Sequence, residues 1–276
     1  MIFRQLFDSV SCTYSYLLAG RRGGEALIID PVLDKVDRYI QLLHELDLKL
    51  VKAIDTHTHA DHVTGMGSLR DRTHCITVMG EQSGVDVVSM RVADGDRIEI
   101  EGVALEAIHT PGHTNDSYSF RMPDRVFTGD TLLIRGTGRT DFQNGDPRAQ
   151  YRSIFERLLA LPDETLVYPA HDYKGDTVST IGEERAFNPR LQVKSIDEYV
   201  EVMMSLHLPN PKMMDVAIPA NMRIGLRQDE IARRGWALSP ADALPLLGQS
   251  DTEIVDLREP HERDAHGVIP GSRRVP

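Results

Sequence analysis

The stretch Thr56-His57-Thr58-His59-Ala60-Asp61-His62 gathers three of the chain's 11 histidines and one aspartate into a short segment. It follows the apolar run Leu50 to Ile54, which predicts a buried strand. Functional groups of α/β folds usually lie in the loop after a strand. Because imidazole and carboxylate are preferred ligands of zinc and iron, the stretch predicts a metal centre.

Three further candidate ligands follow along the chain, each at the end of an apolar run. They are His113 in Thr110-Pro-Gly-His-Thr114, Asp130 in Phe127-Thr-Gly-Asp-Thr131, and His171 in Tyr168-Pro-Ala-His-Asp-Tyr173. Pro111-Gly112 and Gly129 provide the tight backbone geometry that brings a ligand to a metal. Each of the three alone is an ordinary loop residue, but the set points to one site. All seven ligand-type residues of a binuclear site are present, so the pattern leaves one metal and two metals open.

Outward from this stretch, short strand-like runs alternate with helical patterns. The expected strands are Tyr14 to Leu18, Ala26 to Ile29, Leu50 to Ile54, Cys75 to Val78, Ile98 to Ile108 and Tyr118 to Arg121. Lys35 to Asp47 predicts a helix with Val36, Ile40, Leu43 and Leu46 on one face, and Pro147 to Leu161 predicts another. The interleaving indicates the α/β class.

Composition narrows the class of substrate. With 31 Lys and Arg against 42 Asp and Glu, the formal charge is 31 − 42 = −11, which argues against nucleic-acid binding and favours a small-molecule substrate. No secretion signal and no membrane-length apolar run is apparent, so we expect a cytoplasmic protein without membrane contact. The two cysteines, Cys12 and Cys75, are expected to be reduced thiols.

The end of the chain reads as a separate segment that begins around Trp236. Leu238 to Leu247 predicts a helix capped by Ser239, and Glu253 to Pro260 predicts a strand that ends in a charged turn. We therefore expect a main domain over residues 1–235 and a tail over residues 236–276. About 40 residues are too few for an independent core.

The order His57, His59, Asp61, His62, His113, Asp130 and His171 resembles the metallo-β-lactamase superfamily. The resemblance covers roughly residues 1 to 225 and implies an αβ/βα sandwich with metal at one edge. Within the superfamily, two groups compete, the persulfide dioxygenases and the glyoxalase II thioesterases. Asp130 to Gln143, Glu184 to Arg190 and Ile218 to Met222 are similar to the dioxygenase pattern. Thr137 is a departure, because relatives can carry a Cys there.

This resemblance implies one Fe(II) per chain, held by His57, His113 and Asp130. The residues His59, Asp61, His62 and His171 would then surround the site without binding the iron. The implied reaction converts glutathione persulfide, O2 and water into glutathione and sulfite. Arg139, Tyr173 and Arg190 are implied to bind the tripeptide, the arginines through its carboxylates. The alternative is a binuclear glutathione thioester hydrolase with two zinc ions or mixed zinc and iron, in which the same surrounding residues bind the second ion.

The tail has a resemblance of its own. Leu238 to Ala243, Ile254 to Arg263 and His266 to Gly271 resemble the opening of a rhodanese domain, less than half of one. Rhodanese chemistry needs a nucleophilic Cys, and no Cys follows Cys75. We therefore expect an incomplete rhodanese-like segment without sulfurtransferase activity. A rhodanese as a functional partner and a homodimer are the expected associations.

Overall fold

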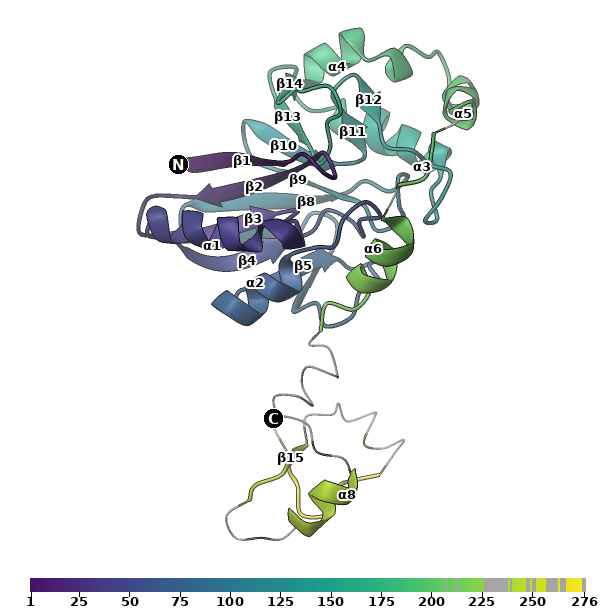
Figure 1. Ribbon diagram of the computed structural model, residues 1–276. Helices are drawn as coiled ribbons and strands as arrows, with labels where there is room; N and C mark the ends of the chain where they lie inside the picture. The colour runs from purple at the N-terminus through teal and green to yellow at the C-terminus, as the bar shows by residue number, and fades with distance from the viewer. Residues whose placement is uncertain are drawn as a thin grey trace. The chain divides into compact units, whose positions relative to one another are not determined.

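Two six-stranded mixed sheets form the main body of the protein in this computed structural model (Figure 1). The structure describes residues 1–206, 208–211, 213–225, 238, 240–246, 249, 252–256, 263 and 267–274. Contacts divide the chain into two compact units, Met1–Gly225 and Leu226–Pro276. The two sheets belong to the first unit.

The first sheet has the order β1-β2-β3-β4-β5-β6, and the second has the order β14-β13-β10-β9-β8-β7. The strands of the first are β1 (Ile2–Asp8), β2 (Thr13–Ala19), β3 (Glu25–Ile29), β4 (Lys49–Ile54), β5 (Ile76–Gly80) and β6 (Met90–Val92). Those of the second are β7 (Arg97–Ile100), β8 (Val103–His109), β9 (Tyr118–Arg121), β10 (Arg125–Gly129), β13 (Leu166–Pro169) and β14 (Ser179–Thr180). A small hairpin joins β11 (Leu132–Leu133) to β12 (Gly136–Thr137).

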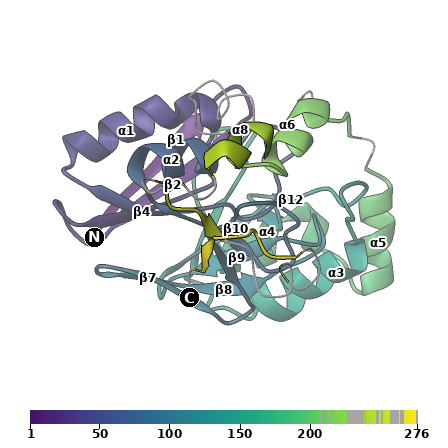
Figure 2. The ribbon, with the colours of Figure 1, turned by 90° about the horizontal axis from the view of Figure 1, so that it is seen from below.

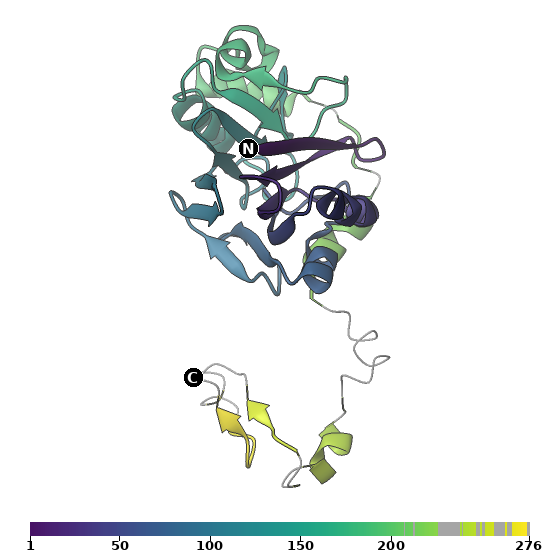
Figure 3. The ribbon, with the colours of Figure 1, turned by 90° about the vertical axis from the view of Figure 1, so that its left-hand side faces the viewer.

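Helices cover the outer face of each sheet (Figures 2 and 3). The apolar faces of α1 (Val36–Glu45) and α2 (Met66–Thr73) pack on the first sheet. The second sheet is covered by α3 (Pro147–Arg152) with its π-helical continuation η2 (Ser153–Leu158), by α4 (Ile181–Phe187) and by α5 (Ile196–Met204). The remaining short elements of this unit are η1 (Leu33–Lys35), η3 (Pro189–Leu191) and α6 (Met214–Asn221).

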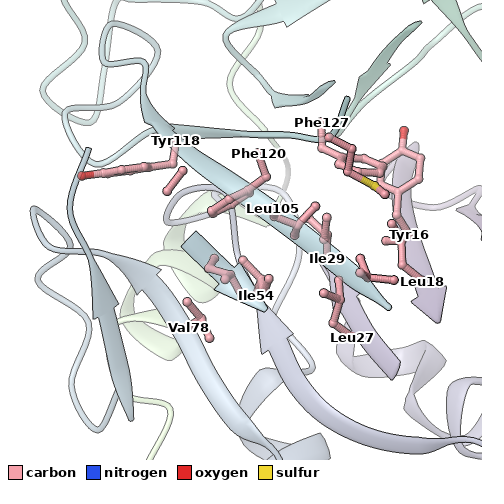
Figure 4. Packing of buried hydrophobic residues seen from close by; sticks show 14 of the residues in the cluster. Tyr16, Leu18, Leu27, Ile29, Ile54, Val78, Leu105, Tyr118, Phe120 and Phe127 are labelled. Atoms are coloured by element: carbon pink, nitrogen blue, oxygen red, sulfur yellow. The ribbon is translucent and has the colours of Figure 1, made fainter. Parts of the chain in front are cut away.

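The main core lies between the sheets, where Tyr16, Leu18, Ile54, Phe120 and Phe127 come together (Figure 4). Strand β2 is buried on both faces, because its alternate side chains point to the two layers. Tyr16 and Leu18 belong to the core between the sheets, whereas the next residues on the other face pack under the helices. This arrangement of helix, sheet, sheet and helix is the predicted αβ/βα sandwich.

Most of the expected strands are confirmed, but the single strand predicted over Ile98 to Ile108 is wrong. The segment is a hairpin of β7 and β8, because Gly102 adopts φ +73° and turns the chain. The helix predicted over Lys35 to Asp47 is also present, but its buried face is shifted. Tyr39 and Leu42 are buried on it beside Val36 and Leu43, while Ile40 and Leu46 are only partly covered.

The second unit contains short elements where the tail is predicted to have a helix and a strand. These are α8 (Pro240–Ala243), η4 (Leu244–Leu246), β15 (Val255–Asp256) and β16 (Arg273–Arg274), the last two paired in parallel. The expected segment start at Trp236 and the capping Ser239 lie outside the described residues. Among the residues that the structure describes, no helix is both long and apolar enough to cross a bilayer.

Candidate metal centre

The loops that follow β4, β8, β10 and β13 bring the predicted ligands together. Strand β10 runs parallel to β13, and β8 runs in the same direction because both β8 and β10 are antiparallel to β9. Their carboxyl ends therefore meet at one edge of the second sheet. A backbone hydrogen bond of 2.8 Å from Tyr118 N to Thr56 O ties the loop after β4 to this edge.

His57, His113 and Asp130 form the first group of candidate ligands. One ligand atom from each lies within 4.8 Å of the other two, and all three residues are buried. His113 Nε2 lies 3.6 Å from Asp130 Oδ2. Two imidazoles and one carboxylate are the ligand set of non-haem Fe(II) oxygenases, which leave open positions on the metal.

Hydrogen bonds assign which ring nitrogen of each ligand carries a lone pair. His113 Nδ1 lies 2.7 Å from Arg139 O, and a carbonyl only accepts, so Nδ1 donates and Nε2 keeps its lone pair. Thr56 Oγ1 donates to Asp30, so this oxygen accepts from His57 Nδ1 at 2.9 Å. The Nε2 of His57 is therefore also a lone-pair nitrogen. These outer hydrogen bonds fix both rings for metal binding.

His59, Asp61 and His62 form the second group. His59 Nε2 donates to Asp30 at 3.1 Å, and His62 Nδ1 donates to Asp61 at 2.9 Å. The opposite nitrogens, His59 Nδ1 and His62 Nε2, are buried and have no hydrogen-bond partner. Buried lone pairs without a donor are what a metal ion or ordered water would satisfy. Both groups thus fit a metal by their donor chemistry.

His171 joins the two groups without a free nitrogen. Its Nδ1 lies 2.7 Å from Asp130 Oδ1, and its Nε2 lies 2.9 Å from Asp61 Oδ2. Burial acts to lower the pKa of His171, but the two carboxylates outweigh it and raise the pKa well above its usual value. Each ring nitrogen thus lies at hydrogen-bond distance from a carboxylate, an arrangement that favours the imidazolium form of His171.

The imidazoles of His57 and His59 have lowered pKa values, which favours their neutral form. Burial and the adjacent His59 lower the pKa of His57 to about 3, and burial lowers that of His59 well below its usual value. Burial acts to raise the pKa of Asp130, but the imidazoles, His171 foremost, hold it below its ordinary range. Neutral imidazoles and an ionised carboxylate are the forms that bind metal.

Two glycines allow the loops to approach this closely. A Cβ on Gly138 would lie 2.1 Å from Asp130 O and 2.8 Å from His113 Nδ1. At Gly112, φ is +139° and a Cβ would lie 2.3 Å from the backbone of Gln150. No side chain fits at either position without moving a ligand loop.

Two residues that hold the histidine stretch are missing from the sequence-based prediction. Asp30 accepts from Thr56 N at 2.7 Å as well as from His59. Asn221, at the end of α6, donates to His59 O at 2.9 Å and His62 O at 2.8 Å, and accepts from Thr64 N at 2.8 Å. Asn221 lies in the Ile218 to Met222 motif, whose resemblance was the available signal. No comparable motif marks Asp30.

A pocket of about 240 Å³ opens beside the first group. Its lining includes His113, Asp130, Asp61 and His171, and also the three predicted substrate residues Arg139, Tyr173 and Arg190. Tyr173 is 68% exposed, and its ring stacks parallel to His171 at 6.0 Å. Leu133, Ile134 and Phe142 supply apolar wall. Two of the three predicted iron ligands, His113 and Asp130, therefore share one cavity with the predicted substrate residues.

Comparison with known proteins agrees with this geometry. Residues 12–171 match the family model described as the metallo-beta-lactamase superfamily. The chain is 48% identical over 230 residues to the persulfide dioxygenase ETHE1, mitochondrial, of Homo sapiens, covering 82% of this chain and 90% of the human one.

The chain belongs to the persulfide dioxygenase family of the metallo-β-lactamase superfamily. The solved structure of ETHE1 from Myxococcus xanthus superposes with a TM-score of 0.78 at 51% identity, covering 80% of this chain and 98% of that one. A more distant structure, TTHA1623 in a di-iron-bound form, has a TM-score of 0.57 at 26% identity and covers 67% of this chain and 98% of that one. The predicted fold and the predicted family are both confirmed. The chain carries a metal-binding site of the His and Asp type.

Proposed function

We propose that this chain is an Fe(II)-dependent persulfide dioxygenase that oxidises glutathione persulfide. The balanced reaction is glutathione persulfide plus O2 plus H2O giving glutathione, sulfite and two protons. The observation that carries the proposal is the cluster of His57, His113 and Asp130, of which His113 and Asp130 line a pocket that also holds cationic side chains. The family membership supplies the reaction class.

One Fe(II) per chain is proposed, with His57 Nε2, His113 Nε2 and Asp130 Oδ2 as its protein ligands. When bound, a ferrous ion at such a site offers open positions to a sulfur anion and to dioxygen. The chain's own part is to hold these ligands rigidly. The carbonyl of Arg139 orients His113, and the His171 imidazolium occupies Asp130 Oδ1. We propose that His171, which lies between Asp130 Oδ1 and Asp61 Oδ2, supports the ligand Asp130 without binding the iron.

We propose that Arg139, Tyr173 and Arg190 bind the substrate, because all three line the same pocket. Arg190 and Arg139 would meet the carboxylates of the tripeptide, and Tyr173 would contact it through its ring or hydroxyl. The apolar side chains of Phe142 and Leu133 exclude water next to the metal ligands. Phe142 also contacts the His113 ring edge to face at 6.2 Å between ring centres.

A second candidate function is the binuclear glutathione thioester hydrolase. It is favoured by one observation, the pair of buried nitrogens His59 Nδ1 and His62 Nε2 that lack partners. A second ion there would hold a hydroxide for attack on a thioester. The di-iron form of TTHA1623 shows that a relative with this fold can bind two ions.

An assay of the anaerobically purified protein separates the two functions. We expect oxygen uptake with glutathione persulfide and one sulfite formed per O2 consumed. Cleavage of a glutathione thioester without oxygen uptake would instead establish the hydrolase. The same preparation should be assayed after metal removal, when both activities should disappear.

We also propose domain boundaries, a cellular location and interaction partners for this chain. We propose a dioxygenase domain over residues 1–235 and an incomplete rhodanese-like segment over residues 236–276. A cytoplasmic location, a homodimer and a rhodanese as functional partner are proposed from the sequence alone. Coexpression with a rhodanese and size-exclusion chromatography test the last two.

A further inference from the structure

Four arginine and lysine residues line the pocket, and two of them already have carboxylate partners. Arg139 Nε and Nη2 bind the two oxygens of Asp141, both at 2.6 Å. The Arg135 guanidinium pairs with Glu184, which is fully buried. A substrate carboxylate that approached either arginine would meet an anion already in place and would be repelled by it.

The other two cations, Arg190 and Lys174, are paired differently. Arg190 Nη1 donates to the carbonyl and the hydroxyl of Thr137, which are neutral groups. Within the part of the chain that the structure describes, Lys174 forms no ion pair. Both residues line the pocket that holds His113 and Asp130. Their charges are therefore the ones available to an anionic ligand.

The backbone at Lys174 is fixed next to the metal centre. Asp172 is buried, and its Oδ2 accepts the backbone N–H groups of Lys174 at 2.8 Å, of Gly175 and of Asp176 at 2.9 Å. Gly175 turns the chain with φ +96°. This turn starts directly after His171, so the lysine is anchored within three residues of the imidazolium that holds Asp130. Asp172 is thus a positioning residue for Lys174.

We propose that Lys174 is a further substrate-binding residue, and that Lys174 and Arg190 each bind one of the two carboxylates of the tripeptide persulfide. This inference rests on the proposed function and refines its specificity. It makes Lys174, in place of Arg139, the second carboxylate-binding residue beside Arg190, because Arg139 is already paired with Asp141. Persulfides with one carboxylate would fill only one of the two cationic positions.

The test pairs protein variants with esters of glutathione, with calorimetric binding as the readout. Metal-loaded wild-type protein, K174M and R190M are titrated with glutathione, its glycine monoester and its diester. K49M is the matched control, because Lys49 is an exposed lysine at the start of β4, the end of that strand opposite the metal loop. Oxygen uptake with the persulfides is measured in parallel.

Each esterification should weaken binding to the wild-type protein and to K49M by about tenfold or more, the usual scale for a charged hydrogen bond. In K174M, one of the two esterifications should leave the binding affinity unchanged. In R190M, the other esterification should do so. If both steps cost the same in K174M as in the wild type, Lys174 binds no carboxylate and the inference is overturned. If the wild-type protein shows the expected effects of esterification on binding but takes up no oxygen, the proposed function is overturned, whereas the assignment of the carboxylate sites still holds.

Discussion

The two histidine groups contain the same kinds of donor but differ in what surrounds them. In the first group, His113 and Asp130 line the pocket, and Asp130 uses Oδ1 for His171 while Oδ2 faces His113. In the second, Asp61 Oδ2 already accepts from His62, His171 and Thr13. Donor chemistry alone therefore does not define a catalytic metal site. The first group places two of its three members, His113 and Asp130, in the pocket lining, whereas the second places only Asp61 there.

The largest effect is expected when one ligand of the first group is removed. His113→Ala removes one of three protein ligands, so we expect metal affinity to fall by more than about 100-fold and oxygen uptake to be lost. His171→Ala is the matched comparison. It removes a support of Asp130 but no ligand, and metal affinity should fall by only about 10- to 100-fold. Elemental analysis and anaerobic metal titration measure both.

Equal metal loss in the two variants would mean that His171 is itself a ligand. The second group would then be a metal site of the same rank, and the distinction between the groups would disappear.

A smaller change tests how tightly the first group is packed. In Gly138→Ala, the new Cβ would lie 2.1 Å from Asp130 O, so the ligand loops must move. We expect a loss of about 1–3 kcal/mol in stability together with weaker metal binding. Gly136→Ala is the control, since a Cβ there meets nothing closer than 3.8 Å. Thermal unfolding of metal-free and metal-loaded protein gives the comparison, and identical behaviour of the two variants would show that the loops are not tightly packed.

Asn221 supports the second group through hydrogen bonds to the backbone of the histidine stretch, so its replacement tests the role of that group. Asn221→Ala leaves two backbone carbonyls of the histidine stretch and the backbone N–H of Thr64 without their partner. The expected cost is about 1–3 kcal/mol of unfolding free energy. Because only His57 of the three proposed ligands belongs to this stretch, kcat per bound iron should change less than the unfolding free energy does. A larger effect on kcat than on denaturant midpoint would show that the second group takes part in the reaction.

The smallest effect is expected for removal of residues 226–276. All the proposed ligands and substrate residues lie in the unit Met1–Gly225. Activity per iron should therefore stay within about twofold of that of the full chain. The intact chain should show no thiosulfate sulfurtransferase activity, because no Cys follows Cys75. Oxygen uptake and thiocyanate assays on the two chains measure these outcomes.

The sequence predicts the first group and most strands well because few residue types bind metal and because ligand loops follow strands. It does not reveal Asp30 or Asn221, which reach the histidine stretch across 26 residues (Asp30 to Thr56) and 162 residues (Asn221 to His59). Such contacts depend on how the strands and α6 pack, which no local pattern encodes.

The pairing of Arg139 with Asp141 shows a different limit. Both residues are visible two positions apart in the sequence, but only the structure shows that the guanidinium is already bound. A cationic residue in a motif therefore predicts a charge in the pocket without predicting whether that charge is available. The wrong prediction of a single strand over Ile98 to Ile108 has a similar cause. A run of strand-forming residues does not show that a residue with positive φ, here Gly102, interrupts it.

We propose that one iron per chain, which the first group would hold, is sufficient for oxidation of the persulfide by O2. The most direct test of this proposal is an anaerobic titration of metal-free protein with Fe(II), with oxygen uptake on glutathione persulfide measured at each point. We expect activity to rise linearly and to reach its plateau at one iron per chain. A plateau only at two irons per chain, or full occupancy of two sites without oxygen uptake, would contradict the account and support the binuclear hydrolase.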